Sequence, residues 1–177
     1  MTTGQMLITV AAMLLLSLLI LRVGSTTIIN QDSMQNSKFG VLAVSIASSI
    51  LEEATMKSFD ENSNTDPRTY FSNVNELTVN GSLGIDSGEN ADSIETFDDF
   101  DDFADFAKTY DSLQSAVFNV TCEINYVDPD IGGLITANRT WHKMLTVTIS
   151  SPSIVKPGTE EMQELVFNKI FSYFHFQ

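Results

Sequence analysis

The chemistry most visible in this sequence is a concentration of carboxylates between Asp86 and Asp105, which holds nine acidic residues and no basic one. From residue 97 to residue 106 it reads FDDFDDFADF, with phenylalanine at every third position. Neighbouring carboxylates repel one another unless water solvates them or a cation neutralises them. Calcium suits such a segment because it takes about six to eight oxygen ligands. The candidate ligands are Asp98, Asp99, Asp101, Asp102 and Asp105.

The alternative interpretation is a solvated acidic loop that its phenylalanines pin to the protein. The spacing is not that of an EF-hand, and the glycine that an EF-hand loop requires is missing. The sequence therefore leaves calcium as one of two interpretations, and implies no other cofactor.

No arrangement of residues typical of catalysis is present. The two histidines, His142 and His175, lie in predicted strands with no evident nucleophile beside them. Cys122 falls on the apolar face of a predicted strand, where a thiol is normally inert. We therefore expect that the protein is not an enzyme.

The N-terminal part of the sequence is apolar and is expected to form a helix. From Met6 to Leu21 no residue is charged, and only Thr9 and Ser17 are polar. Sixteen helical residues span roughly 24 Å, and the flanking residues extend the helix to the thickness of a bilayer core. No basic residue precedes the run and no small-residue cleavage site follows it, so a retained membrane helix over residues 1–24 is favoured over a removed signal peptide. Its apolar surface is represented by Met6, Leu7, Leu14, Leu15, Leu18 and Leu21.

The segment over residues 25–59 is predicted to continue this helix in amphipathic form. It contains no proline, and apolar residues recur at spacings of three and four. The residues expected to pack on the rest of the protein are Phe39, Leu42, Ile46 and Ile50.

Residues 60–177 are expected to form a globular head that contains the acidic loop over residues 86–105. Strict alternation of apolar and polar residues predicts half-buried strands over residues 118–126 and 141–150, with a closing strand over 165–176. The loop between the first two strands favours an antiparallel hairpin. The predicted fold class is α+β, with a long N-terminal helix packed on a small antiparallel sheet.

Charge excludes one class of partner. The chain has 9 basic and 23 acidic residues, for a net charge of −14. An acidic surface of this kind repels phosphate backbones, so no nucleic acid is expected as a general partner.

The order of these elements resembles the bacterial type IV pilins and the related pseudopilins of type II secretion. The start Met-Thr-Thr-Gly-Gln-Met-Leu-Ile-Thr-Val is similar to a mature pilin terminus, and residues 49–54 and 97–103 are also similar to pilin-like proteins. Two features depart from the family: Gln5 stands where its members usually have glutamate, and the C-terminal disulfide of many pilins is missing. Processing is therefore left open between Met1 as the mature N-terminus and cleavage after Gly4.

The resemblance implies a structural subunit that polymerises through its N-terminal helix. It implies identical subunits in a helical filament as partners, together with the assembly machinery and, before assembly, the inner membrane. The implied location is the inner membrane and then an extracellular filament on the cell surface. The alternative is a monomeric, single-pass anchored binding module that exposes its β-rich domain outside the inner membrane.

Overall fold

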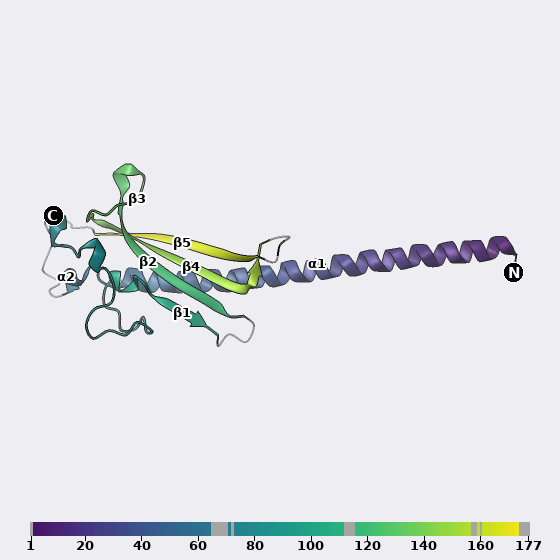
Figure 1. The fold of residues 1–177 in the computed structure, drawn as a ribbon, viewed down its shortest axis with the longest axis horizontal. Coiled ribbons are helices and arrows are strands. Elements are labelled where there is room, and N and C mark those ends of the chain that lie inside the picture. The colour runs from purple at the N-terminus through teal and green to yellow at the C-terminus, as the bar shows by residue number, and fades with distance from the viewer. Residues whose placement is uncertain are drawn as a thin grey trace. The chain divides into compact units, whose positions relative to one another are not determined.

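The computed structural model describes residues 2–64, 71, 73–111, 116–156, 159 and 161–173. Contacts divide the chain into two compact units, Met1–Gly40 and Val41–Gln177. The fold is α+β, as predicted, with a long N-terminal helix followed by a small antiparallel sheet (Figure 1).

The helix α1 comprises Thr3–Met56. It begins with half of a capping box, because the backbone N–H of Thr2 donates to Oε1 of Gln5 at 3.3 Å. The polar segment 25–37 stays helical because it has no proline, and its hydroxyl groups bond inside the helix. Thr26, Thr27 and Ser37 each donate to the carbonyl four residues earlier.

The sheet consists of β1 (Ala107–Tyr110), β2 (Phe118–Asp128), β3 (Leu134–Ile135), β4 (His142–Val155) and β5 (Met162–Ser172). All its pairings are antiparallel, and the strand order is β1-β2-β4-β5, with the short β3 paired to the end of β2. Cys122 of β2 lies opposite Val147 of β4, which lies opposite Phe167 of β5. The two predicted strands and their hairpin are confirmed. The closing strand begins earlier than expected, and residues 174–176 of that prediction lie outside the described residues.

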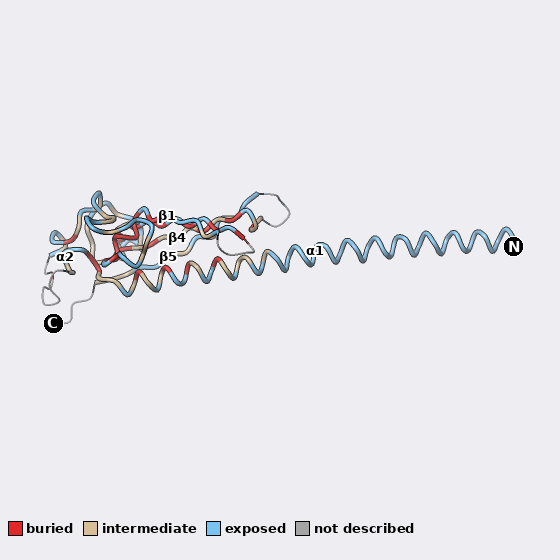
Figure 2. The backbone as a smooth tube through the Cα atoms, turned by 90° about the horizontal axis from the view of Figure 1, so that it is seen from below, coloured by how far each residue is buried: buried red, intermediate tan, exposed pale blue. Residues whose placement is uncertain are grey.

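One face of this sheet is buried, because apolar residues alternate along each central strand. In β2 the even positions from Phe118 to Tyr126 are buried, and in β4 the odd positions from Lys143 to Ser151 are buried. The part of α1 that belongs to the second unit runs along this sheet in both ribbon views (Figures 1 and 2). Its fully buried residues are Ala43, Ala47, Ile50 and Ala54.

Between α1 and β1 the chain forms only short elements. They are α2 (Glu61–Asn64) and the 3-10 turns η1 (Val74–Glu76), η2 (Asn80–Ser82) and η3 (Asp101–Phe103); a fourth, η4 (Pro129–Ile131), follows β2. The η3 turn lies inside the predicted acidic loop, so this loop is structured where its aspartates are densest.

Candidate functional site

The first half of α1 presents an apolar surface with nothing packed on it within its own unit. Its large hydrophobic residues from Met6 to Val23 are between 56% and 74% exposed. Among the described residues, α1 is the one helix long and apolar enough to cross a membrane. Leu7, Leu14, Leu15, Leu18 and Leu21 are all part of this surface, as the sequence predicts. Met1 lies outside the described residues, and Gly4 lies in the first turn of α1.

The polar side chains of this apolar half are satisfied inside the helix. The Thr9 hydroxyl donates to the Met6 carbonyl at 2.9 Å, and the Ser17 hydroxyl donates to the Met13 carbonyl at 2.8 Å. Gln5 accepts from the backbone of Thr2, so its amide oxygen serves the start of its own helix. The spacing of Thr2 and Gln5 is the sequence signature of a capping box, and sequence reasoning missed it.

One of the four residues predicted to pack α1 on the head, Ile50, lies at the centre of the observed contact. Ile50 is 1% exposed, while Leu42 and Ile46 are half-buried and Phe39 belongs to the first unit. The centre of the contact is formed by Ala43, Ala47 and Ala54, together with Ile50. Small side chains allow a helix to approach a sheet closely.

The phenylalanines of the acidic segment are buried and contact one another. Phe97, Phe100, Phe103 and Phe106 are each at most 2% exposed. The ring centroids of Phe97 and Phe103 are 5.0 Å apart in an edge-to-face arrangement, and Phe100 lies 5.1 Å from Phe171 of β5. The prediction that phenylalanines pin this segment is therefore confirmed.

Asp98 and Asp105 are exposed, but the prediction of solvated aspartates is wrong for Asp99, Asp101 and Asp102, which are at most 2% exposed. Two of them are used by the local backbone. Oδ1 of Asp99 accepts from the N–H groups of Asp101 and Asp102, and Oδ2 of Asp102 accepts from those of Asp98 and Asp99. Asp105 is exposed and has a positive φ of 62°, so the five predicted calcium ligands do not converge on one point.

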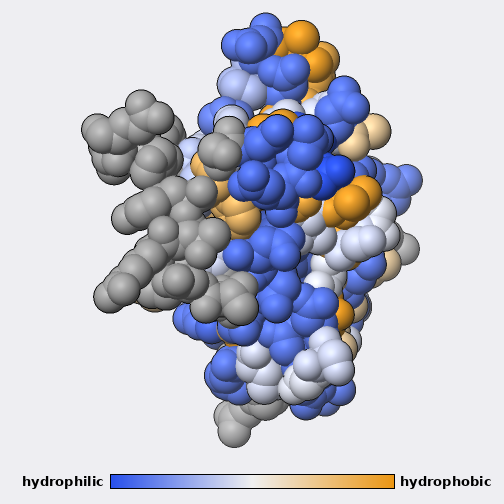
Figure 3. Space-filling model, turned by 90° about the vertical axis from the view of Figure 1, so that its left-hand side faces the viewer, coloured by the Kyte–Doolittle hydropathy of each residue, from blue (hydrophilic) through white to orange (hydrophobic). Residues whose placement is uncertain are grey.

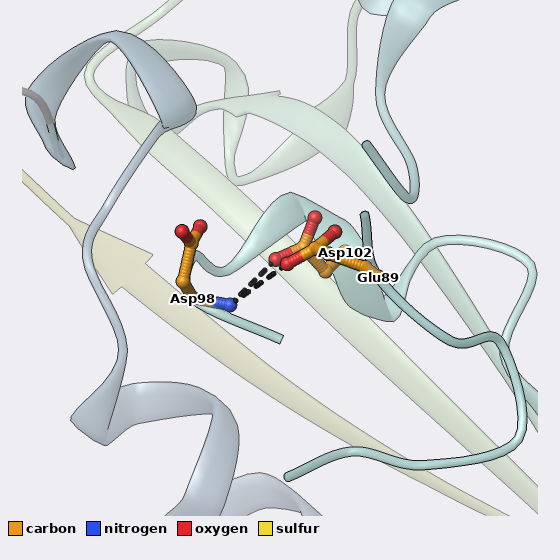
Figure 4. A group of neighbouring side chains, drawn as sticks. All are labelled: Glu89, Asp98 and Asp102. Atoms are coloured by element: carbon orange, nitrogen blue, oxygen red, sulfur yellow. Dashed lines mark hydrogen bonds between the residues drawn. The ribbon is translucent and has the colours of Figure 1, made fainter. Parts of the chain in front are cut away.

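A smaller carboxylate group comes closer to a metal-binding arrangement. Glu89, Asp98 and Asp102 each offer an oxygen within 4.8 Å of the others. In Figure 4 the backbone nitrogen of Asp98 lies between its own carboxylate and the oxygens of Glu89 and Asp102, to which it donates. Carboxylate oxygens are suitable ligands for calcium. Those of Glu89 and Asp102, however, already accept a hydrogen bond from the backbone N–H of Asp98. Calcium binding stays a prediction.

Burial changes the acidity of this group. Burial raises the pKa of Asp102 to about 7, and Glu89 adds to this increase. The hydrogen bonds from the backbone N–H groups of Asp98 and Asp99 act in the opposite direction. Burial also raises the pKa of Asp99 to about 9, and repulsion from Asp101 and Asp102 adds to the shift. Oδ2 of Asp99 is buried without a hydrogen-bond partner. Burial therefore favours the neutral form of the Asp99 carboxyl group.

The group that sequence reasoning missed is centred on Lys143 of β4, which is 0% exposed. Its Nζ atom lies 2.5 Å from Oδ1 of Asp101, 2.8 Å from Oδ2 of Asp60 and 2.9 Å from the carbonyl oxygen of Phe59. Aromatic rings line the same space: Nζ is 4.8 Å from the centroid of Phe59 and 5.5 Å from that of Tyr126. A buried charge is tolerated only when it is paired, and here one cation faces two carboxylates.

Asp60 is held by several donors besides Lys143. It accepts from the N–H and the hydroxyl of Thr78 and from the N–H of Asn62. The Tyr126 hydroxyl donates to the carbonyl of Thr78 at 2.7 Å and closes the same pocket. The polar atoms of this pocket are therefore organised around a fixed Asp60.

The remaining residues singled out by chemistry have structural surroundings. Nδ1 of His142 is 2.7 Å from the Ser172 hydroxyl across the β4–β5 pair. Cys122 is buried, and burial raises the pKa of its thiol to about 12, so it is not a reactive thiolate at neutral pH.

Part of the head surface is apolar. Met162, Val166 and Ile170 are between 48% and 57% exposed on the outer face of the edge strand β5, and Leu134 and Ile135 of β3 are also exposed. Figure 3 shows one view of the protein in which hydrophobic patches stay small among hydrophilic residues.

Comparison with known proteins gives no relative. No family model, curated protein or solved structure matches this chain.

Proposed function

We propose that this protein is a structural subunit of a pilus-like filament of the type IV pilin class, which polymerises through the apolar half of α1. The observation that supports this most directly is the make-up of α1, which is apolar and exposed in its first half and packs on the sheet through its second half. Inside a membrane such a helix satisfies its own backbone. In a filament, identical helices replace the lipid around it.

Two further observations support the proposal. The hydroxyls of Thr9 and Ser17 bond to the helix backbone, so neither presents an unpaired hydroxyl hydrogen to lipid or to a neighbouring helix. The alanine contact between α1 and the sheet joins the apolar helix to a head that carries most of the acidic residues. On this proposal the head covers the filament and faces water.

The second candidate function is a monomeric, membrane-anchored binding module. The observation that favours it is the exposed apolar face of β5, which is an edge strand able to pair with another chain.

Mechanical shearing of cells separates the two functions. We expect the 19.5 kDa chain in the sheared fibre fraction, with the mature N-terminus within the first few residues of the sequence. A chain that stays with the membrane after shearing contradicts the filament and supports the anchored module. A polypeptide that begins near Ser25 contradicts both.

A further inference from the structure

The group around Lys143 brings an amine and a carboxyl group into contact in the buried interior of the head. The side chains of Lys143, Asp60 and Asp101 are 0%, 0% and 3% exposed. Nζ of Lys143 lies 2.5 Å from Oδ1 of Asp101, so Cγ, the atom that an amine would attack, lies at most one C–O bond further away. Groups held at such distances in a fixed orientation react as if they were present at very high concentration.

The surroundings favour the neutral forms that amide formation needs. Asp101 and the adjacent Asp99 are 2% and 1% exposed, so water does not solvate a charge on either carboxyl group. The rings of Phe59 and Tyr126 flank Nζ and exclude water. A proton that passes from the ammonium to Asp101 leaves an uncharged amine beside an uncharged carboxyl group, which a dry pocket prefers to an ion pair.

The two carboxylates differ in a way that assigns their roles. Asp60 is held on both oxygens by Thr78, Asn62 and Lys143, which fixes its orientation and leaves its carbon poorly accessible to attack. Asp101 lies in the η3 turn and directs Oδ1 at Nζ. Asp101 is therefore the acyl group, and Asp60 is placed to carry a proton.

We propose that Lys143 and Asp101 join in an intramolecular isopeptide bond that staples the acidic segment to β4. The lone pair of Nζ attacks Cγ of Asp101, and the Nζ–Cγ bond forms. Asp60 takes a proton from Nζ and returns it to the departing oxygen, the bond from Cγ to that oxygen breaks, and one water leaves. An ammonium and a carboxylate thus become one amide and one water, with no oxidant or co-reactant.

The bond would fix two segments that lie 42 residues apart in the chain. The bond would replace a buried ion pair by a neutral amide. It would also reduce the conformational entropy of the unfolded chain, as a disulfide does. The proposal does not depend on filament assembly, because it concerns the interior of a single head.

The test is the intact mass of the full chain, purified in detergent at neutral pH and shown to be folded by its resistance to protease. We expect a mass lower than the sequence mass by one water, and a digest in which the peptides of Lys143 and Asp101 are linked. A folded chain with the full sequence mass overturns the proposal, and so does a water loss that maps to other residues.

Matched variants separate the roles. Lys143→Arg and Asp101→Ala should each carry the full mass expected for their sequence. Lys156→Arg should keep the water loss, because Lys156 and Glu161 form an exposed pair at 2.9 Å without a dry pocket. Asp60→Asn should slow bond formation about 100-fold or more, the scale of a lost general base. If the bond forms at an unchanged rate in Asp60→Asn, the proposed role of Asp60 is wrong. If a variant does not fold, the mass of the wild-type chain still shows whether the bond is present.

Discussion

Ser58 and Asp99 form a parallel backbone bridge, in which the N–H of Ser58 donates to the carbonyl of Asp98 and the N–H of Phe100 donates to the carbonyl of Ser58. This bridge holds the two segments side by side, and the residues two positions further along each chain lie close together. Those residues are Asp60 and Asp101, the two carboxylates that contact Lys143. The end of α1 and the acidic segment are thereby held in the register that Lys143 requires.

Loss of the buried amine should destabilise the head strongly. In Lys143→Met both Asp60 and Asp101 lose their buried partner, and we expect the free energy of unfolding to fall by about 3–5 kcal/mol. Denaturant unfolding of the full chain in detergent measures this. Lys156→Met, which breaks an exposed pair, should cost about 1 kcal/mol or less. Equal losses in the two variants would contradict a buried, paired Lys143.

Stability should decrease as the pH rises through neutrality. The pKa of Asp102 is raised to about 7 in the folded head, so between about pH 4 and pH 7 the folded state holds a proton that the unfolded state has lost. This contribution is complete below about pH 4 and is lost as the pH passes 7, with a slope of at most about 1.4 kcal/mol per pH unit. Asp99, with a pKa of about 9, extends the decrease to higher pH.

The variant that checks this is Asp102→Asn, which keeps an oxygen for the backbone N–H groups but cannot titrate. Between about pH 5 and pH 8, its free energy of unfolding should depend less on pH than that of the wild type. This window spans the pKa of Asp102, which is about 7. Asp105→Asn is the control, because Asp105 is exposed and asparagine tolerates its positive φ. The same pH slope in Asp102→Asn and wild type would sink the prediction.

The alanine contact of α1 should not tolerate a larger side chain. Ala47 is 0% exposed, so Ala47→Leu overpacks the space between helix and sheet and should cost about 1–3 kcal/mol. Ser48→Leu adds a similar side chain at an exposed neighbouring position and should change stability by about 0.5 kcal/mol or less. Thermal unfolding of both variants checks this, and a tolerated Ala47→Leu would mean that α1 is not packed closely there.

The strands and the helix could be predicted from the sequence, because period-two and helical patterns depend only on which residues face the core. The same alternation also contained an overlooked signal. Lys143 falls between Trp141 and Leu145 at an inward position, and a lysine at such a position implies a buried acidic partner.

Which acid serves as that partner could not be predicted. Asp60 begins a polar run that reads as a solvated loop, and Asp101 is one of several similar aspartates. Only the pairing of Ser58 with Asp99, far apart in the sequence, selects these two residues. The solvated interpretation of the acidic segment fails for the same reason, since its carboxylates bind local N–H groups that the residue pattern does not reveal.

A charge in the apolar half of α1 should abolish the proposed filament. Leu15→Lys places an ammonium on the exposed apolar surface, where neither lipid nor a neighbouring helix solvates it. We expect no chain in the sheared fraction, compared with full recovery for Gln35→Lys in the polar segment of the same helix. Fibres from Leu15→Lys would show that this surface is not the filament core.

Assembly should also depend on ionic strength. Subunits of net charge −14 repel one another, and the screening length shortens from about 30 Å at 0.01 M salt to about 3 Å at 1 M. The fraction of chain that sediments as filament should rise with sodium chloride, and a divalent cation should act at lower concentration. Filaments whose stability is unchanged by a chelator at low salt would contradict this prediction.

The internal hydrogen bonds of Thr9 and Ser17 have a consequence for any change of environment. Their hydroxyl protons stay on the same carbonyls whether fatty chains, detergent or protein surround the helix. The uncharged run over residues 6–21 therefore moves from one medium to another without breaking either of these two hydrogen bonds, and the cost depends mainly on contact and dispersion.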